Sequence, residues 1–94
     1  MAGPSRITEQ STPRFAPQVV FRYDEARERW VILAPERVLM PDDIAVEILK
    51  RCDGSDVAAI VADLARSFEE DAGVIRGDVV AMLQDLADKG VLEA

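Results

Sequence analysis

The chain offers few side chains that could carry out chemistry. Cys52 is its single cysteine, and none of the 94 residues is histidine, so the commonest general base and metal ligand at neutral pH is missing. A nucleophilic thiol needs a neighbouring histidine or cation to lower its pKa, whereas a carboxylate at Asp53 raises it. We therefore interpret Cys52 as a buried core thiol, and we predict that the protein is not an enzyme.

Three further features have a plain structural interpretation. The acidic run Glu69–Asp71 lacks the alternating ligands and central glycine of a calcium loop, so a solvated loop is favoured over a cation site. The scattered glycines form no phosphate-binding motif. Trp30 lies in an apolar run and is interpreted as a core or interface residue rather than a stacking platform. We expect neither a metal nor a cofactor.

The charge is unevenly distributed. The formal net charge is −7, and residues 1–37 carry six arginines against five acids, whereas residues 38–94 carry five basic groups against thirteen acids. Binding to a phosphate backbone needs clustered Lys and Arg, so nucleic acid is a poor partner. No apolar run has the length of a membrane span, and no signal peptide is recognisable. A single-domain, soluble, cytoplasmic protein is expected, with no membrane partner.

The first half of the chain predicts an antiparallel meander. Residues 1–17 are rich in Ser, Thr, Gln and Pro and are predicted to be a flexible N-terminal tail, with residues 18–94 as the domain. Three short β-branched or apolar runs follow, separated by a charged loop and a Pro-Glu turn. The predicted strands are Gln18–Tyr23, Trp30–Ala34 and Arg37–Met40.

Three helices are predicted after the strands. Asp42 or Asp43 is expected to cap the first, whose apolar face comprises Ala45, Ile48, Leu49 and Cys52. The second is predicted from the cap Ser55 to Phe68, with an apolar face of Val57, Ile60, Val61, Leu64 and Phe68. The third is predicted over Val74–Lys89, with an apolar face of Ile75, Val79, Met82, Leu83 and Leu86. The pair Val91-Leu92 is expected to pack against the core.

The strand Arg37–Met40 is tied to its neighbour on one side and is a candidate open edge on the other. An open edge is a template for another chain, because strand addition supplies main-chain hydrogen bonds while alternate side chains set specificity. Val38 and Met40 face one side of the sheet, and Arg37 and Leu39 face the other. The residues alone leave two interpretations open: a peptide pairs with this edge, or a helix, the tail or a second copy covers it.

The stretch Leu33–Gly54, with the aliphatic run VAAIVADLARSF after it, resembles the pyrroloquinoline-quinone biosynthesis protein D (PqqD) family. Features of that family are a Pro-Glu turn, a strand that ends in Leu-Asn or a similar pair, an Ala-x-x-Ile-Leu helix and Cys-Asp-Gly. Each is common alone, but their order and spacing are specific, and the resemblance covers roughly residues 15–93. The corresponding positions are Pro35-Glu36, Pro41-Asp42, Ala45–Leu49 and Cys52-Asp53-Gly54.

The resemblance implies an α+β, winged-helix-like fold in which a three-stranded antiparallel β-meander is followed by three α-helices. It implies a non-catalytic peptide chaperone, a recognition element for a ribosomally made and modified peptide (RiPP). Such a chaperone binds the precursor peptide PqqA by strand addition and presents it to the radical-SAM enzyme PqqE during synthesis of pyrroloquinoline quinone (PQQ). The implied peptide-binding residues, on the third strand and third helix, are Arg37, Val38, Leu39, Met40, Val80, Leu83 and Gln84.

Two other functions compete with peptide binding. A winged-helix DNA-binding regulator is the first, although the third predicted helix holds only Arg76 and Lys89 against three aspartates. A structural homo-oligomer that uses the open edge for itself is the second. A homodimer is also compatible with peptide binding, because self-pairing and ligand pairing would compete for one edge.

Overall fold

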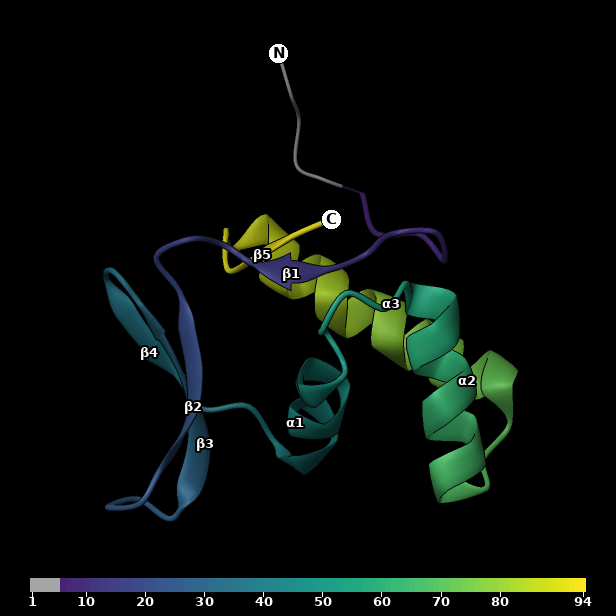
Figure 1. Cartoon of the computed structure of the whole chain (residues 1–94), viewed down its shortest axis with the longest axis horizontal. Helices are drawn as coiled ribbons and strands as arrows, with labels where there is room; N and C mark the ends of the chain where they lie inside the picture. The colour runs from purple at the N-terminus through teal and green to yellow at the C-terminus, as the bar shows by residue number, and fades with distance from the viewer. Residues whose placement is uncertain (1–5) are drawn as a thin grey trace.

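The computed structural model describes residues 6–94; residues 1–5, part of the predicted tail, lie outside the described residues. In Figure 1 a three-stranded sheet stands at the left, α1 in the middle and α2 at the right, while α3 runs obliquely from α2 towards β5. The predicted α+β class, a three-stranded antiparallel sheet followed by three helices, is confirmed. The elements are β1 (Arg14–Phe15), β2 (Val20–Asp24), β3 (Arg29–Ala34), β4 (Arg37–Leu39), α1 (Asp43–Lys50), α2 (Val57–Phe68), α3 (Ala72–Asp88) and β5 (Leu92–Glu93).

The sheet has the order β2-β3-β4, and both pairings are antiparallel. Phe21, Ile32 and Leu39 lie opposite one another across the three strands and pack into or against the hydrophobic core. Since alternate residues face opposite sides, the neighbouring row of Leu33 and Val38 faces away from that core. One face of the sheet therefore rests on the helices and the other does not.

The strands are slightly displaced from the predicted ones. β2 begins at Val20 rather than Gln18, because the chain first makes a turn in which the Val19 amide donates to the Ala16 carbonyl at 3.0 Å. β4 ends at Leu39 rather than Met40, shortly before Pro41, which has no N–H to donate to a ladder.

Aspartates cap all three helices. Asp42 accepts a hydrogen bond from the Ala45 amide and begins α1, as predicted. The prediction of Ser55 as the cap of α2 is wrong, because Asp56 occupies that position and the Ser55 hydroxyl donates instead to Asp53. A carboxylate at the positive end of a helix is the stronger acceptor there.

The acidic run between α2 and α3 shapes the turn between these helices. Glu69 adopts a left-handed conformation (φ 53°) and ends α2. Asp71 accepts hydrogen bonds from the amides of Gly73 and Val74 and caps α3. α3 therefore begins at Ala72, two residues before the predicted Val74.

The core lies between the sheet and the helices and follows most of the predicted apolar faces. Buried side chains from α1, α2 and α3 form it together with Ile32, and Val91 and Leu92 pack into it as expected. Phe68 departs from the prediction, since it is exposed at the end of α2. The buried helical residues are Val46, Ile48, Leu49, Val57, Ile60, Val61, Leu64, Val79, Leu83 and Leu86.

Residues 6–17, which we call the N-terminal segment, correct the prediction of a flexible tail. Ile7 is only 4% exposed within the core, and Pro13 is fully buried. Arg14 and Phe15 form β1, which pairs with β5 at the other end of the chain. A low density of apolar residues suggested disorder, yet a few well-placed apolar side chains and backbone hydrogen bonds dock this segment.

Candidate functional site

β4 is an edge strand. It pairs with β3 through the register Ile32↔Leu39, Leu33↔Val38 and Ala34↔Arg37, and it stands last in the strand order. The prediction that this strand pairs with its neighbour on one side is thus confirmed. The opposite side of β4 presents backbone groups that no strand of residues 6–94 pairs.

The turn geometry identifies which groups these are. Only Pro35 and Glu36 separate Ala34 from Arg37, and residues that flank a two-residue hairpin loop form a hydrogen-bonded pair. Hydrogen-bonded and non-hydrogen-bonded pairs alternate along an antiparallel ladder. The Leu33↔Val38 pair is therefore non-hydrogen-bonded, so Val38 directs its N–H and C=O towards the open edge, whereas Leu39 directs its own towards Ile32.

The side chains of this strand divide between the two faces of the sheet. Leu39 packs against the core. Val38 and Met40, on the other face, are each 50% exposed. A chain that pairs with β4 would extend both faces, so its alternate side chains would meet the helix side and the outer side of the sheet in turn.

A second feature is a groove of about 340 Å³ between the three helices. Three large apolar side chains that line it are exposed: Ile44, which is 70% exposed, Phe68 and Val74. Only three residues separate Met40 from Ile44, so the open edge and the groove lie within about 14 Å of each other along the chain. This apolar groove is lined by Ile44, Glu47, Ile48, Leu64, Phe68, Glu70, Val74, Ile75, Asp78 and Val79.

The residues expected from the third helix lie elsewhere on α3. Leu83 is 0% exposed and belongs to the core. Val80 and Gln84 line a shallow hollow with Ile7 of the N-terminal segment, and the Gln84 side chain accepts a hydrogen bond from the Ile7 amide at 2.8 Å. The apolar groove is lined instead by Val74, Ile75, Asp78 and Val79 of α3.

Sequence reasoning missed the exposed apolar residues of the groove. Ile44 falls outside the i, i+3, i+4 face of α1, and Val74 falls outside that of α3. The signal in the sequence was an apolar residue that follows a helix cap and lies off the core-facing side of its helix. Single exposed apolar residues are common, so this signal alone does not identify a binding groove. Only the packing of the three helices brings these residues together with Phe68.

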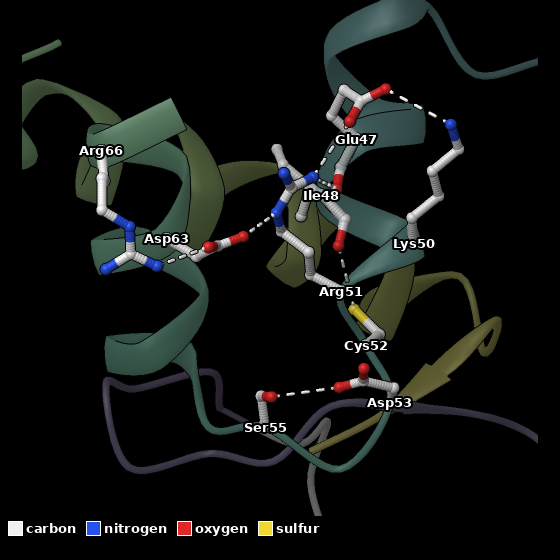
Figure 2. A network of polar contacts seen from close by, with 9 residues as sticks. All are labelled: Glu47, Ile48, Lys50, Arg51, Cys52, Asp53, Ser55, Asp63 and Arg66. Atoms are coloured by element: carbon white, nitrogen blue, oxygen red, sulfur yellow. Dashed lines mark hydrogen bonds and ion pairs between the residues drawn. The ribbon is translucent and has the colours of Figure 1, made fainter. Parts of the chain in front are cut away.

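A network of charged side chains joins α1 to α2 (Figure 2). The Arg51 guanidinium donates to the carboxylates of Glu47, at 3.0 Å, and Asp63, and Arg66 donates to Asp63 from the next turn of α2 at 2.8 Å. The hydrogen bond from Arg51, followed by the contacts with Arg66, holds the pKa of Asp63 below its usual 3.8. Because Glu47 also lines the apolar groove, the network ties α2 to the α1 wall of the groove.

This lowered pKa predicts a pH-dependent effect of Asp63→Asn. A carboxyl whose pKa is lower in the folded state stabilises the fold above its unfolded pKa and loses that contribution as pH falls through the folded value. Urea unfolding should therefore show Asp63→Asn less stable than the parent near pH 7, with the difference vanishing well below pH 3.8. A difference that persists unchanged at pH 2 would refute the ion-pair account, and Asp85→Asn, which removes the exposed pair with Lys89 at the end of α3, is the control.

Cys52 follows Arg51 of this network in the chain, and its surroundings disfavour the reactive thiolate form. Its thiol donates weakly to the Ile48 carbonyl at 3.6 Å. Burial, with a smaller contribution from the charge of Asp53, raises the pKa of Cys52 to about 12. Cys52 is partly buried and packs against the core rather than lying wholly within it, and a reactive cysteine would require the opposite pKa shift.

The raised pKa predicts slow alkylation of the native protein. At pH 8 only about one native thiol in ten thousand would be ionised, against roughly a quarter at the ordinary pKa. Iodoacetamide should therefore label Cys52 at least about a hundredfold more slowly in the native chain than in urea. Equal rates would show that the thiol is not buried in solution.

Trp30 occupies the centre of an aromatic cluster on the helix-facing side of the sheet. Its ring stacks on Phe21 at 4.8 Å and meets the edge of Tyr23 at 5.9 Å, while Phe21 stacks on Phe15 of the N-terminal segment. The Lys50 ammonium lies 5.3 Å from the Trp30 ring centre. These contacts agree with the core or interface role that the sequence indicated.

Within residues 6–94, no group of three or more His, Cys, Asp or Glu side chains has an arrangement that would hold a metal ion. In the same part of the chain, no helix has both the length and the apolar character needed to cross a membrane.

Comparison with known proteins agrees with the fold and with the sequence resemblance. Residues 29–92 match the family model for coenzyme PQQ synthesis protein D (PqqD). A protein from Rhodopseudomonas palustris strain HaA2, called PqqA binding protein, is 60% identical over 87 residues, which cover 92% of this chain and 85% of that protein. A protein of the same name from Xanthomonas euvesicatoria is 42% identical over 89 residues, covering 94% and 97% of the two chains.

Two solved structures are also similar. One is the solution structure of the PqqD truncation of Methylobacterium extorquens PqqCD, described as a functional, stand-alone RiPP recognition element; it matches with a TM-score of 0.82 at 39% identity, covering 97% of this chain and 98% of that one. The other is the crystal structure of PqqD from Xanthomonas campestris, with a TM-score of 0.60 at 39% identity over 94% and 99% of the chains.

Proposed function

The chain belongs to the coenzyme PQQ synthesis protein D family, and from this membership we propose that it is a non-catalytic chaperone that binds the precursor peptide PqqA. Similar proteins are called PqqA binding protein, and a similar structure is described as a RiPP recognition element. The chain matches these proteins over nearly its whole length, so the property is carried over to the entire domain rather than to a fragment.

The observation that carries the mechanism is the open edge of β4. Val38 offers an N–H and a C=O that β3 does not use, as the register shows. An extended peptide that pairs here completes this edge and gains main-chain hydrogen bonds. The edge is short, so side-chain contacts must supply much of the affinity, and the apolar groove next to Ile44 offers them.

The proposed site keeps Arg37–Met40 as the docking strand and changes the contribution of α3. Leu83 lies in the core and supports the site from there. Val80 and Gln84 lie on the side of α3 that faces the N-terminal segment, so their contribution to the site comes from that side. The proposed contact wall of α3 is the groove side, with Val74 and Ile75. Apolar side chains of the peptide fill the groove while its backbone pairs with β4.

The radical-SAM enzyme PqqE is the proposed recipient of the bound peptide, as the family resemblance implies. The proposed setting is the cytoplasm, where a lone thiol such as Cys52 stays reduced. A homodimer through the open edge of β4 is proposed as a competing state of the free protein. Light scattering should then show saturating PqqA converting dimers to one-to-one complexes, and a dimer that PqqA leaves unchanged would exclude a shared edge.

The DNA-binding alternative is less well supported. The cations on α3 and at its C-cap already have acidic partners: Arg76 pairs with Glu9 and Lys89 with Asp85. A reading helix must instead offer free Arg or Lys to phosphates and bases. The net charge of −7 opposes approach to a polyanion as well.

The proposed function is tested by fluorescence anisotropy with labelled PqqA and the full chain. We expect saturable one-to-one binding, with little binding of a scrambled PqqA of the same composition. A short DNA duplex labelled in the same way serves as the second probe. Equal binding of the scrambled peptide, or tighter binding of DNA that weakens steeply with salt, would reject the proposal.

A further inference from the structure

The N-terminal segment lies against the flank of α3 that points away from the apolar groove. The Ile7 amide donates to the Gln84 side chain at 2.8 Å, and Glu9 forms an ion pair with Arg76. Ile7 also lines a hollow together with Gly77 and further residues of α3. On a helical wheel of 100° per residue, the centre of these positions lies opposite the centre of the four α3 residues that line the groove, which are Val74, Ile75, Asp78 and Val79.

The segment is itself held firmly at several points. Ile7 is buried in the core. The carbonyls of Glu9 and Ser11 accept hydrogen bonds from the first free amides of α2, at 3.0 Å and 2.9 Å, which a helix start otherwise leaves unpaired. Further on, β1 pairs with β5 (Figure 1). The segment therefore connects α2, α3 and the C-terminal strand.

The first half of α3 needs such external support. It contains Gly73 and Gly77, and a glycine inside a helix is markedly less favourable than alanine. A Cβ at Gly73 would lie 3.0 Å from the capping carboxylate of Asp71, so that glycine leaves room for the cap. A Cβ at Gly77 would meet nothing within 4 Å, so close packing does not account for the second glycine. The helix wall next to the groove is thus intrinsically weak.

We propose that the N-terminal segment sets the affinity for peptide by holding α3 in place, with Ile7 and Glu9 as positioning residues that do not touch the peptide. This inference rests on the proposed placement of the peptide in the groove. If only the ordered form of α3 accepts the peptide, the apparent affinity falls with the fraction of molecules in that form. Loosening the segment therefore weakens binding from a distance.

The first experiment compares Ile7→Ala with Val61→Ala in the full chain. Both remove buried methyl groups from the core, but Val61 lies on α2 and lines neither the groove nor the hollow beside Ile7. We expect Ile7→Ala to weaken PqqA binding about tenfold or more and to speed hydrogen exchange of amides in the first half of α3. Val61→Ala should change affinity less than about twofold under conditions where both variants are folded.

The second experiment uses a milder, exposed substitution, which still tests the proposal if Ile7→Ala does not fold. Glu9→Arg breaks the ion pair with Arg76, and we expect a two- to fivefold loss of PqqA affinity, the range of an exposed pair. The double variant Glu9→Arg/Arg76→Glu restores the pair with reversed charges and should restore the affinity. Adding Gly77→Ala to Glu9→Arg should also recover binding, because it strengthens the helix without filling a contact.

The results separate this inference from the proposed function. Unchanged PqqA affinity in Ile7→Ala and Glu9→Arg, whether or not α3 exchanges faster, overturns the role of the segment while PqqA binding by the parent stands. Failure of Gly77→Ala and of the charge reversal to recover affinity also overturns it. If the parent itself does not bind PqqA, the proposed function fails, and faster exchange of α3 in Ile7→Ala would remain a structural effect alone.

Discussion

Val38→Pro is expected to weaken PqqA binding strongly while the domain stays folded. Proline lacks the N–H that Val38 directs to the open edge, and its ring obstructs the neighbouring pairs of an added strand. A main-chain hydrogen bond contributes about 0.5–1.5 kcal/mol net, so loss of one bond with disturbance of its neighbours should weaken binding at least about tenfold. Anisotropy with labelled PqqA measures the loss, and circular dichroism checks the fold.

The matched control is Val38→Thr, which keeps the N–H and the β-branched shape. It should bind PqqA within about threefold of the parent. Leu39→Pro should behave differently from both, because the Leu39 amide belongs to the ladder with Ile32. Losing this hydrogen bond within the sheet should mainly lower the free energy of unfolding. Normal binding by Val38→Pro would exclude pairing at this edge.

Ile44→Glu has the second largest expected effect. Ile44 is 70% exposed and lines the apolar groove, and burying such a side chain contributes about 1.5–3 kcal/mol. We therefore expect PqqA affinity to fall about ten- to a hundredfold in titrations with the variant. Stability should be nearly unchanged, because a glutamate in the first turn of α1 suits the positive end of the helix.

Val20→Glu is the control for this change. Val20 is another exposed apolar residue, 50% exposed on β2, the strand at the opposite edge of the sheet from β4. Its replacement adds the same charge and should leave PqqA binding within about twofold. If both variants lose affinity equally, the cause is the added negative charge and not the groove; if neither does, the groove takes no part.

The elements with strong local signals were predictable from the sequence. The Pro35-Glu36 turn predicted the β3–β4 hairpin, and an aspartate after Pro41 predicted the start of α1. These signals act between residues close in the chain, where turn chemistry and capping decide the conformation. The same locality explains why β4 could be identified as a strand with one tied side.

Features that depend on distant contacts were not predictable. Residues 6–17 have a composition typical of disorder, yet Ile7 docks against Gln84, 77 positions later in the chain. The side of α3 that lines the groove is likewise set by how the helices pack, so a choice between Val80 and Val74 from periodicity alone had no physical basis. Tertiary packing decides such positions, and a single sequence does not display it.

Hydrogen exchange at Val38, followed by NMR in the full chain with and without PqqA, tests strand addition most directly. In the free protein the Val38 amide should exchange rapidly at the open edge, while the Leu39 amide, bonded to β3, should exchange slowly. Saturating PqqA should slow exchange at Val38 at least about tenfold and leave Leu39 little changed. Saturation by PqqA without any protection of Val38 would contradict strand addition to β4.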